Sequence, residues 1–191
     1  KLTEKKQSQI VEAACELFFK KGFHETSIRE IADKSGMSMG QLYHYISSKD
    51  DILFLVAKHM QELFYEHLVE VGLEKIQEPL AKFVKALRVA IEFPARHKKL
   101  IQFIFTEAKF LGKKHLDIIL KMDDINLSGF FQKLLEEVNE KHPVNYNLEQ
   151  AAKLIIYITA FPALKGWSVK KWSLEDNADF QVRFILKGLG L

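Results

Sequence analysis

The sequence contains little cysteine, little proline and little glycine for a chain of 191 residues. Its single cysteine, Cys15, excludes an intramolecular disulfide and is typical of the reducing cytoplasm, where we expect this protein to work. Four prolines and nine glycines leave long stretches free of helix-breaking residues. The longest apolar run, residues 154–164, is too short to cross a membrane and contains Pro162. The sequence also begins without a secretory signal pattern, so we expect no membrane partner.

A strong excess of either charge is also missing. Lysine and arginine total 28 against 25 aspartates and glutamates, so the net charge is +3 and composition alone does not indicate a nucleic-acid partner. Only four of the basic residues are arginines, and arginine is the residue that makes bidentate contacts with guanine. Any reading of a DNA sequence by this chain therefore cannot depend on a row of arginines.

Sequence patterns of catalytic sites are absent as well. There is no Cys-x-x-Cys pair, no glycine-rich phosphate loop and no Gly-x-Ser-x-Gly motif, so we expect no enzyme, no cofactor and no metal site. One alternative is a metal-binding enzyme in a helical bundle, because carboxylates and histidines recur at helical spacing in two sets. These sets are His59, Glu62, Glu66 and His67, and His115, Asp117, Asp123 and Asp124. The other interpretation of both sets is a solvated helix face.

What the sequence does contain is a helical rhythm along nearly its whole length. Apolar residues recur every three or four positions, and no alternating run is long enough for a strand, which predicts an all-α fold of about nine helices. The expected helices span about 3–21, 26–34, 38–46, 49–70, 79–93, 97–111, 113–141, 148–170 and 173–187. Their starts are marked by the capping pairs Ser27 with Glu30, Ser38 with Gln41, Ser48 with Asp51, Asn147 with Gln150 and Ser173 with Asp176. We expect Pro94 to lie beyond the end of its helix and Pro162 to bend the helix that contains it.

The most informative stretch is residues 26–49, TSIREIADKSGMSMGQLYHYISSK. Two short helices are joined by a tight turn that contains Gly36, and this is the pattern of a helix-turn-helix motif. Ala32 is small where the two helices cross, and Gly36 can adopt the positive φ that the turn requires. The residues expected to pack these helices against the first helix are Ile28, Ile31, Leu42 and Ile46.

The second short helix then keeps a free face that suits DNA. Hydroxyl, amide and aromatic groups on it can donate to phosphates or lie against base edges, and Gly40 lets the backbone approach closely. The residues expected on this face are Ser38, Met39, Gly40, Gln41, Tyr43, His44 and Tyr45. Thr26 and Lys49 flank the face as expected phosphate contacts. The alternative is a purely structural three-helix module with an aromatic packing face.

Residues 16–53, ELFFKKGFHETSIREIADKSGMSMGQLYHYISSKDDIL, resemble the DNA-binding domain of TetR-family repressors. The resemblance implies a helix-turn-helix domain over residues 1–48 and a helical domain for ligand binding and dimerisation over residues 49–191. It also implies DNA contacts by Thr26, Ser38, Gly40, Gln41, Tyr43, His44, Tyr45 and Lys49. Two positions depart from the family: Met39 replaces a frequent lysine or arginine, and Ile46 replaces the usual phenylalanine. Eight basic and eight acidic side chains in residues 1–51 make the region neutral, so binding must depend on how the charges are distributed.

A helix-turn-helix half-site makes too few base contacts for specificity in a genome, so we expect a homodimer on a palindromic double-stranded operator. The last two helices carry more apolar surface than their own pairing needs, and the family resemblance implies a four-helix bundle across a twofold axis. The expected interface consists of Leu154, Ile155, Ile158, Phe180, Phe184 and Ile185. The alternative is that these side chains pack entirely within one chain.

The middle helices are rich in aromatic residues, and the resemblance implies that some of them line a pocket for a small apolar effector. The expected lining is Phe64, Phe103, Phe110, Phe130, Phe131, Tyr157, Phe161 and Trp167. Residues 106–110 resemble family members tied to acyl-CoA metabolism, which implies an acyl-CoA or fatty acid effector. We expect the protein to be a repressor. The ligand would favour a conformation of the dimer in which the spacing of the two recognition helices differs. A DNA-binding protein without a ligand is a further alternative.

Overall fold

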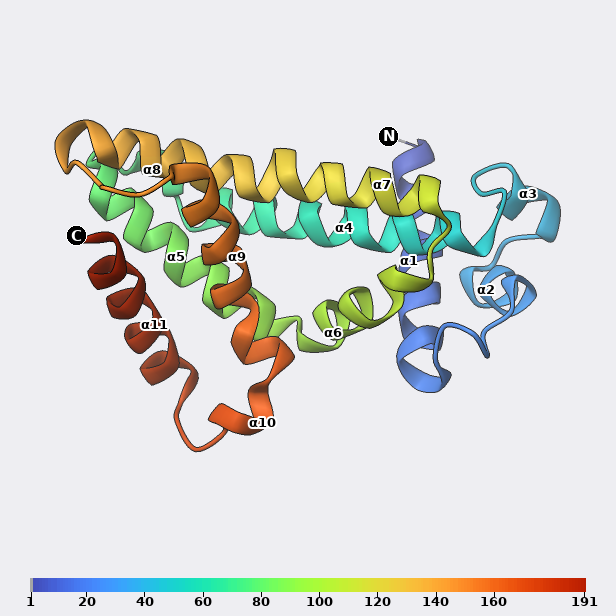
Figure 1. Cartoon of the computed structure of the whole chain (residues 1–191). Helices are drawn as coiled ribbons and strands as arrows, with labels where there is room; N and C mark the ends of the chain where they lie inside the picture. Colours follow the sequence, from blue (N-terminus) through green and yellow to red (C-terminus); the bar gives the residue numbers. More distant parts are fainter. Residues whose placement is uncertain (1) are drawn as a thin grey trace. The chain divides into compact units, whose positions relative to one another are not determined.

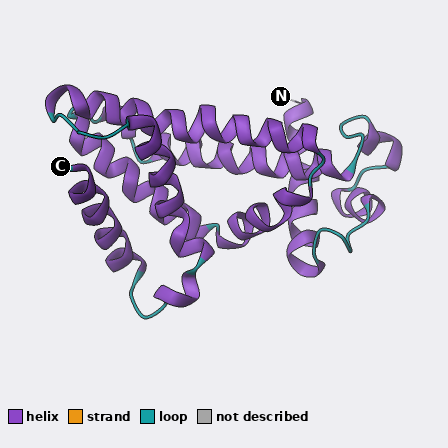
Figure 2. Ribbon diagram, in the orientation of Figure 1, coloured by secondary structure: helices purple, strands orange, loops and turns teal. Residues whose placement is uncertain are grey.

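The computed structural model describes residues 2–191, and the side chains of residues 2–4, 110, 123 and 124 lie outside that description. Across the described residues the secondary structure is helical, with loops and turns but no strand between the helices, which confirms the all-α prediction (Figure 2). The α-helices are labelled in Figure 1. In chain order the elements are α1 (Leu2–Lys21), α2 (Ile28–Ser35), α3 (Met39–Tyr43), α4 (Lys49–Glu70), the 3-10 helix η1 (Leu73–Lys75), α5 (Pro79–Arg96), α6 (Lys98–Glu107), the 3-10 helix η2 (Ala108–Phe110), α7 (Lys113–Met122), the π-helix η3 (Asp123–Ser128), α8 (Gly129–Lys141), α9 (Leu148–Leu164), α10 (Gly166–Val169) and α11 (Leu174–Leu189).

The chain divides into two compact units. The first unit runs through Leu63 and also includes Gln102–Ile119, and the second includes Phe64–Ile101 and Leu120–Leu191. Helices α4, α6 and α7 therefore contribute residues to both units. The structural division differs from the boundary after residue 48 expected from the sequence. The first unit also contains the part of α4 up to Leu63 and the segment Gln102–Ile119, which pack with the first three helices. The assignment of DNA binding to residues 1–48 concerns function and stays a prediction.

The capping pairs read from the sequence are confirmed. Ser27 with Glu30, Ser38 with Gln41 and Ser173 with Asp176 form reciprocal capping boxes. Asn147 accepts a hydrogen bond from the Gln150 N–H, and Ser48 accepts one from the Asp51 N–H. A serine or asparagine cap contributes about 1 kcal/mol by satisfying an N–H group that the helix leaves unpaired. These caps fix where the helices begin, and short-range sequence patterns were enough to find them.

Several helix boundaries differ from the sequence prediction. Helix α5 continues through Pro94 to Arg96, because a proline in the last turn removes only one hydrogen bond and its buried ring still packs in the core. The helix expected over residues 113–141 contains the π-helical turn η3 between α7 and α8. Helix α9 ends at Leu164, shortly after Pro162, and α10 is a separate short helix.

The second unit is built around α5. This helix packs against α8, α9 and α11, and its side chains Phe83, Leu87 and Ile91 are fully buried. Burying one such side chain contributes roughly 1.5–3 kcal/mol, so these side chains of α5 add substantially to the stability of this unit. Within residues 2–191, no helix combines the length and the apolar character that crossing a bilayer requires.

Candidate nucleic-acid interface

The first three helices form a small core that positions α3. Helix α2 packs against α1 and α3, and Ile31, Leu42 and Ile46 are buried where they meet. Gly36 ends α2 with φ 67°, and its N–H and that of Met37 bond to carbonyls in the last turn of α2. An L-residue rarely adopts this φ, so the glycine is what allows the sharp turn into α3. The predicted helix-turn-helix packing is therefore present.

The start of α2 is held to the end of α1 by an ion pair. Lys21 Nζ lies 2.6 and 2.7 Å from the two carboxylate oxygens of Glu30, which also accepts hydrogen bonds from Ser27. The hydrogen bond from Lys21 and those from the Ser27 backbone and hydroxyl lower the pKa of Glu30 to about 2. The carboxylate thus stays charged at neutral pH, and its ion pair with Lys21 joins the end of α1 to the start of α2.

The face of α3 that the sequence predicts for DNA is open to solvent. Leu42 points into the core, while Tyr43 is 51% exposed. Ser38, Gly40, Gln41, Tyr43 and His44 are exposed, and Met39 and Tyr45 are half-buried. The His44 and Tyr45 rings meet edge to face, with centroids 5.9 Å apart. The structure therefore brings the predicted contacts of α3 together on one accessible surface.

The Gln41 side chain presents a hydrogen-bond donor more readily than an acceptor to any molecule that meets this face. Its side-chain Oε1 accepts the Ser38 N–H at 3.0 Å as part of the capping box, and its own N–H bonds to Ser38 Oγ at 3.2 Å. The side-chain NH₂ group and the Ser38 hydroxyl hydrogen remain free to donate. Gln41 is thus arranged to reach an acceptor on a base edge, such as N7 of a purine, while Ser38 can reach a phosphate.

Gly40 is not required by the fold. Its φ is not positive, and a Cβ added to it would meet nothing within 4 Å. A glycine inside a helix costs about 0.5–1 kcal/mol relative to alanine, so the fold alone would favour alanine here. The missing side chain instead leaves room above the backbone of α3, on the face that we predict to meet DNA.

A hollow beside α3 reveals a residue that the sequence analysis missed. It is lined by Lys6, Met37, Gly40, Gln41, His44 and Tyr45. Lys6 comes from α1 and brings a positive charge next to the exposed face of α3. The two adjacent lysines near the start of α1 are the signal that could have indicated it, but nothing in the sequence places them beside a helix more than thirty residues away.

The two flanking phosphate contacts expected from the sequence have internal roles. Thr26 is 1% exposed and its hydroxyl donates to the Gly22 carbonyl at 2.8 Å, so the prediction that its side chain contacts phosphate is corrected. Lys49 Nζ donates to the His24 carbonyl at 3.1 Å and lies 4.4 Å from the centroid of the Phe23 ring. Partial burial lowers the pKa of Lys49. An ammonium has three N–H donors and this contact uses one, so a phosphate contact by Lys49 stays a prediction.

Part of the charge of residues 1–51 is paired within the first unit. Lys21 pairs with Glu30, and Lys34 lies 2.6 Å from Glu16, so these acidic groups are neutralised within the first unit. Lys6, at the hollow beside α3, forms no ion pair with any residue that the structure describes. The first turn of α4 contributes two carboxylates, Asp50 and Asp51, that are occupied by hydrogen bonds.

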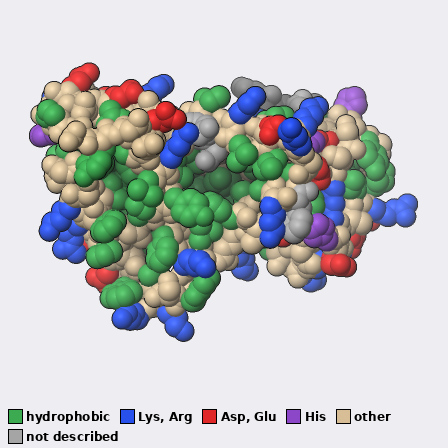
Figure 3. Space-filling view, viewed as in Figure 1, with side chains coloured by type: hydrophobic (Ala, Val, Ile, Leu, Met, Phe, Trp, Pro, Cys, Tyr) green, Lys and Arg blue, Asp and Glu red, His purple; other side chains and the backbone are tan. Residues whose placement is uncertain are grey.

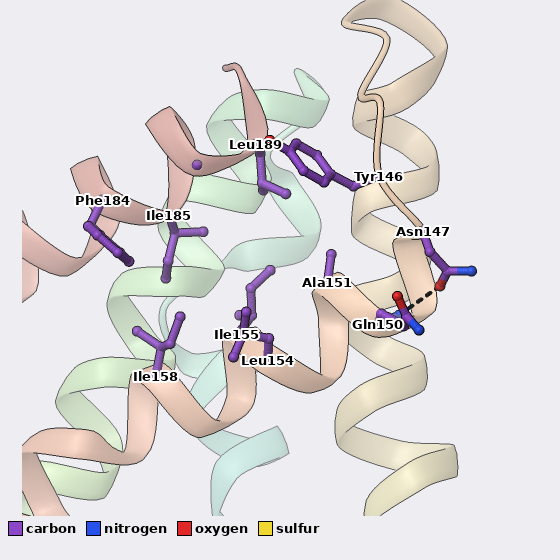
Figure 4. A pocket seen from close by; sticks show the side chains of 11 residues that line it. Tyr146, Asn147, Gln150, Ala151, Leu154, Ile155, Ile158, Phe184, Ile185 and Leu189 are labelled. Carbon is purple, nitrogen blue, oxygen red and sulfur yellow. Dashed lines mark hydrogen bonds between the residues drawn. The ribbon is translucent and has the colours of Figure 1, made fainter.

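A second exposed surface lies in the other unit, between α9 and α11. Hydrophobic side chains gather over these two helices in Figure 3, and Figure 4 shows several of them pointing toward one another across a groove. The groove holds about 280 Å³ and is lined by Tyr146, Asn147, Gln150, Ala151, Leu154, Ile155, Ile158, Phe184, Ile185, Gly188 and Leu189. Leu154 is 61% exposed and Phe184 is 60% exposed, so the apolar rim is open to solvent within one chain.

The predicted dimer residues separate into two groups. Leu154, Phe180 and Phe184 are exposed, and the Phe180 and Phe184 rings stack with centroids 6.2 Å apart. Ile155 and Ile185 are almost fully buried within the chain and form the floor of the groove, where Ile158 is half-buried. Two aromatic residues assigned from the sequence to a ligand pocket, Tyr157 and Phe161, are exposed on α9 instead. They join the same apolar face.

The residues predicted to line the ligand pocket belong to both units. Phe64, Phe130 and Phe131 do form an aromatic cluster in the second unit, with Phe64 also 5.4 Å from Phe93 between ring centroids. Phe103 belongs to the first unit and stacks on Phe18. Trp167, like Tyr157 and Phe161, is exposed to solvent, and its place in a ligand pocket stays a prediction. The side chain of Phe110 lies outside the described residues.

The histidine and carboxylate sets do not come together as metal ligands in the part of the chain that the structure describes. His67 pairs with Glu70 at 3.2 Å on α4, and His115 pairs with Asp51 at 2.6 Å. The side chains of Asp123 and Asp124, which belong to the second set, lie outside the described residues. His67 and His115 thus each pair with a single carboxylate, and neither belongs to a cluster of ligands among the described residues.

Comparisons with known proteins agree with this geometry. The family model described as "Bacterial regulatory proteins, tetR family" matches residues 10–56. The chain is 36% identical over 182 residues to the HTH-type transcriptional regulator HbdR of Aromatoleum sp. (strain CIB), covering 93% of this chain and 75% of the relative. It is 33% identical over 190 residues to the fatty acid metabolism regulator protein of Bacillus subtilis (strain 168), covering 96% and 95% of the two chains.

The fold also has counterparts among solved structures. The crystal structure of AibR in complex with isovaleryl coenzyme A and operator DNA aligns with a TM-score of 0.69, covering 93% of this chain and 96% of that one. The sequence identity is 21%, so this likeness concerns the fold.

Proposed function

Because the chain belongs to the TetR family of bacterial regulatory proteins, and is therefore a transcription regulator and not an enzyme, we propose that it is a repressor released by a small apolar effector. Two copies would bind a palindromic double-stranded operator, each placing α3 in a major groove. The single observation that carries the proposal is the exposed face of α3, which groups free donors and aromatic edges around a glycine that the fold does not need. The protein would act in the cytoplasm, where the operator is.

The DNA contacts follow from the chemistry of that face. Ser38 and Lys6 would bind phosphates and fix the register, and Tyr43 and His44 would add contacts to the backbone or the base edges. Gln41 would read an acceptor on a base with its NH₂ group. Met39, half-buried at the start of α3, would offer apolar contact with a thymine methyl. Lys49 would contact phosphate from the start of α4, and the side chain of Thr26 would hold the turn before α2.

The second copy would occupy the apolar face of α9 and α11. The groove is lined by the exposed side chains of Leu154 and Phe184, and the exposed Phe180 ring stacks on Phe184. Symmetric pairing would cover this apolar face in both chains and remove it from water. Dimerisation would also provide the two half-sites that genomic specificity requires. Ile155, Ile158 and Ile185 would support the interface from beneath.

The effector would be apolar, and an acyl-CoA or a fatty acid is the proposed class. Support comes from the aromatic cluster around Phe64, Phe130 and Phe131, and from two relatives by name. The Bacillus subtilis relative is a fatty acid metabolism regulator, and AibR was solved with isovaleryl coenzyme A. A DNA-binding protein without an effector remains the second candidate, because the described aromatic cluster could be core packing alone.

A melting experiment tests the effector class. A ligand present at about 100 times its dissociation constant stabilises the folded state by about 2.7 kcal/mol, which raises the melting temperature by several degrees. We expect long-chain acyl-CoA thioesters to produce such a shift, measured by differential scanning fluorimetry, and free coenzyme A to produce none. Stabilisation by unrelated ligands but by no acyl-CoA or fatty acid would eliminate this effector class.

Replacing Tyr43 tests the assignment of α3. The Tyr43 side chain is half exposed, so Tyr43→Ala should leave the melting temperature nearly unchanged and weaken operator binding about tenfold, measured by fluorescence anisotropy. Tyr43→Phe is the matched variant: it keeps the ring and removes only the hydroxyl, and it should fall between wild type and alanine. Equal affinity of wild type and Tyr43→Ala for the operator would refute the contact.

A further inference from the structure

The segment that joins α9 to α11 carries both tryptophans of the chain, and both are exposed. Trp167, in α10, is 61% exposed, and Trp172 is 50% exposed. Tryptophan is on average a strongly buried residue, so two open indole rings in one short segment need an explanation. A lysine ammonium lies over each ring: Lys165 Nζ is 4.8 Å from the centroid of Trp167, and Lys171 Nζ is 4.2 Å from that of Trp172. The segment therefore presents flat apolar surface and positive charge together.

A second segment brings further positive charge to α10. The Nζ of Lys98, in the first turn of α6, lies 3.1 Å from the position that a Cβ on Gly166 would occupy. Residues 93–101 and 161–174 together contain six lysines and arginines and no acidic residue, whereas the whole chain has a net charge of only +3. Figure 3 shows lysine and arginine side chains around the region in which Figure 1 places α10. Neither Lys98 nor Lys165 forms an ion pair with a residue that the structure describes. We call three of these side chains the α10 patch: Lys98, Lys165 and Trp167.

The α10 patch borders the aromatic cluster of the second unit. His97 directly precedes Lys98, and its ring packs against that of Phe93 with centroids 4.4 Å apart. Phe93 in turn meets Phe64, a member of the aromatic cluster, with centroids 5.4 Å apart. The patch and the cluster belong to the same unit. A chain of ring contacts therefore leads from an apolar interior to a positively charged surface.

We propose that the α10 patch binds the adenosine phosphate end of an acyl-CoA effector, whose acyl chain lies at the aromatic cluster. This inference rests on the proposed function, and within the proposed effector class it selects the thioester over the free fatty acid. Coenzyme A carries an adenine ring and several phosphate charges at the end far from its thioester, whereas a fatty acid carries a single carboxylate. The adenine ring stacks on the exposed indole of Trp167, and the ammonium groups of Lys98 and Lys165 attract the phosphates.

Neither end of such a ligand is held tightly by itself. Stacking on one exposed ring and pairing with exposed lysines are modest contributions, because water competes for the same groups. The acyl chain makes the second contact intramolecular, so the patch adds its contribution once the chain is bound. This is why free coenzyme A is expected to leave the melting temperature unchanged. It is also why the patch must be tested by comparing an acyl-CoA with the fatty acid of the same length.

The two tryptophans allow the contact to be observed directly. In Trp172→Phe, Trp167 is the only tryptophan left, and stacking of the adenine ring should quench its fluorescence when a long-chain acyl-CoA is added below its micelle concentration. Trp167→Phe is the matched variant: it keeps Trp172 and Lys171, which lie outside the α10 patch, and its fluorescence should stay nearly constant. The fatty acid of the same length should quench neither protein. Equal quenching of Trp167 by that fatty acid would overturn the inference, because the nucleotide would then not be its cause.

Affinities of variants separate the nucleotide end from the acyl chain. Measured by isothermal titration calorimetry, Trp167→Ala should weaken acyl-CoA binding about tenfold. Lys98→Gln combined with Lys165→Gln should weaken it roughly fivefold. Fatty acid binding should change by less than about twofold in both proteins, since a fatty acid does not reach the patch. Lys171→Gln is the control: it removes a lysine that lies over an exposed tryptophan outside the patch, and it should bind acyl-CoA like wild type. The substituted side chains are exposed, so the melting temperatures should hardly change.

The possible failures can be told apart. If wild type binds acyl-CoA but the patch variants bind it equally well, the inference is wrong and the proposed function stands. Binding of the fatty acid and not of the acyl-CoA would also overturn the inference and leave the effector class in place. Quenching of Trp167 by a short DNA duplex, with none by acyl-CoA, would assign the patch to nucleic acid and reject the inference. Failure of wild type to bind any acyl-CoA or fatty acid would instead reject the proposed effector class, and the inference with it.

Discussion

Replacing Gly40 with alanine should make the protein more stable and a poorer DNA-binding protein at the same time. Alanine is favoured over glycine in a helix by about 0.5–1 kcal/mol, and the added Cβ meets no atom within 4 Å in the free protein. The melting temperature should therefore rise by about 1–4 °C. The same methyl group would occupy the space that α3 leaves open toward the groove of DNA.

We expect this substitution to weaken operator binding about tenfold or more, which corresponds to about 1.4 kcal/mol. Opposite changes in stability and affinity are the informative result, because a substitution that merely damages the fold lowers both. Ser8→Ala is the control: Ser8 is exposed on α1, and alanine improves helix propensity there without touching α3. An operator affinity that is unchanged in Gly40→Ala would show that DNA does not approach this part of the backbone.

Placing a charge on the α9–α11 face should have the largest effect on DNA binding. In Phe184→Glu the new carboxylate would lie on the apolar face, and twofold symmetry would bury two such charges without partners in the proposed dimer. Because the Phe184 side chain is exposed in one chain, each chain should still fold with wild-type helix content. We expect a monomer by analytical ultracentrifugation at micromolar concentration.

The loss of the dimer should weaken operator binding about 100-fold or more, since two linked half-sites gain roughly two to four orders of magnitude in affinity over one. Val69→Glu provides the matched control, because Val69 on α4 is an equally exposed aliphatic residue outside the α9–α11 face. It should remain a dimer with wild-type affinity. If the Phe184→Glu protein is still dimeric, the dimer interface does not lie on α9 and α11.

The helix-turn-helix motif could be predicted from the sequence because its determinants are local. Ser27 with Glu30 and Ser38 with Gln41 lie three residues apart, and Gly36 marks the turn between the helices by its backbone conformation alone. The functional surface of α3 follows from these signals, since burying Leu42 leaves the opposite side of a helix exposed. This is why the α3 residues that we predict to contact DNA are found together on one accessible surface.

Residues at the margins of the motif were harder to predict. Thr26 looks like an exposed hydroxyl in the sequence, yet its side chain is buried and bonds to the carbonyl of Gly22. Lys6 looks unrelated to α3, yet it lines the same hollow. Sequence periodicity reports which side of a helix is apolar, but it does not report which other helix that side meets or which hydroxyl finds an internal acceptor.

The sequence by itself determined the helical class, the helix starts and the exposed face of α3, because each depends on residues within one or two turns of a helix. Tertiary structure alone decided that Phe103 and Phe64 belong to different units, that Tyr157 and Phe161 face solvent, and that His115 meets Asp51. These outcomes depend on the packing of segments far apart along the chain. His115 and Asp51 are 64 residues apart, so their contact leaves no periodic pattern in the sequence. The contact forms only when α4 and α7 pack against each other in the folded chain.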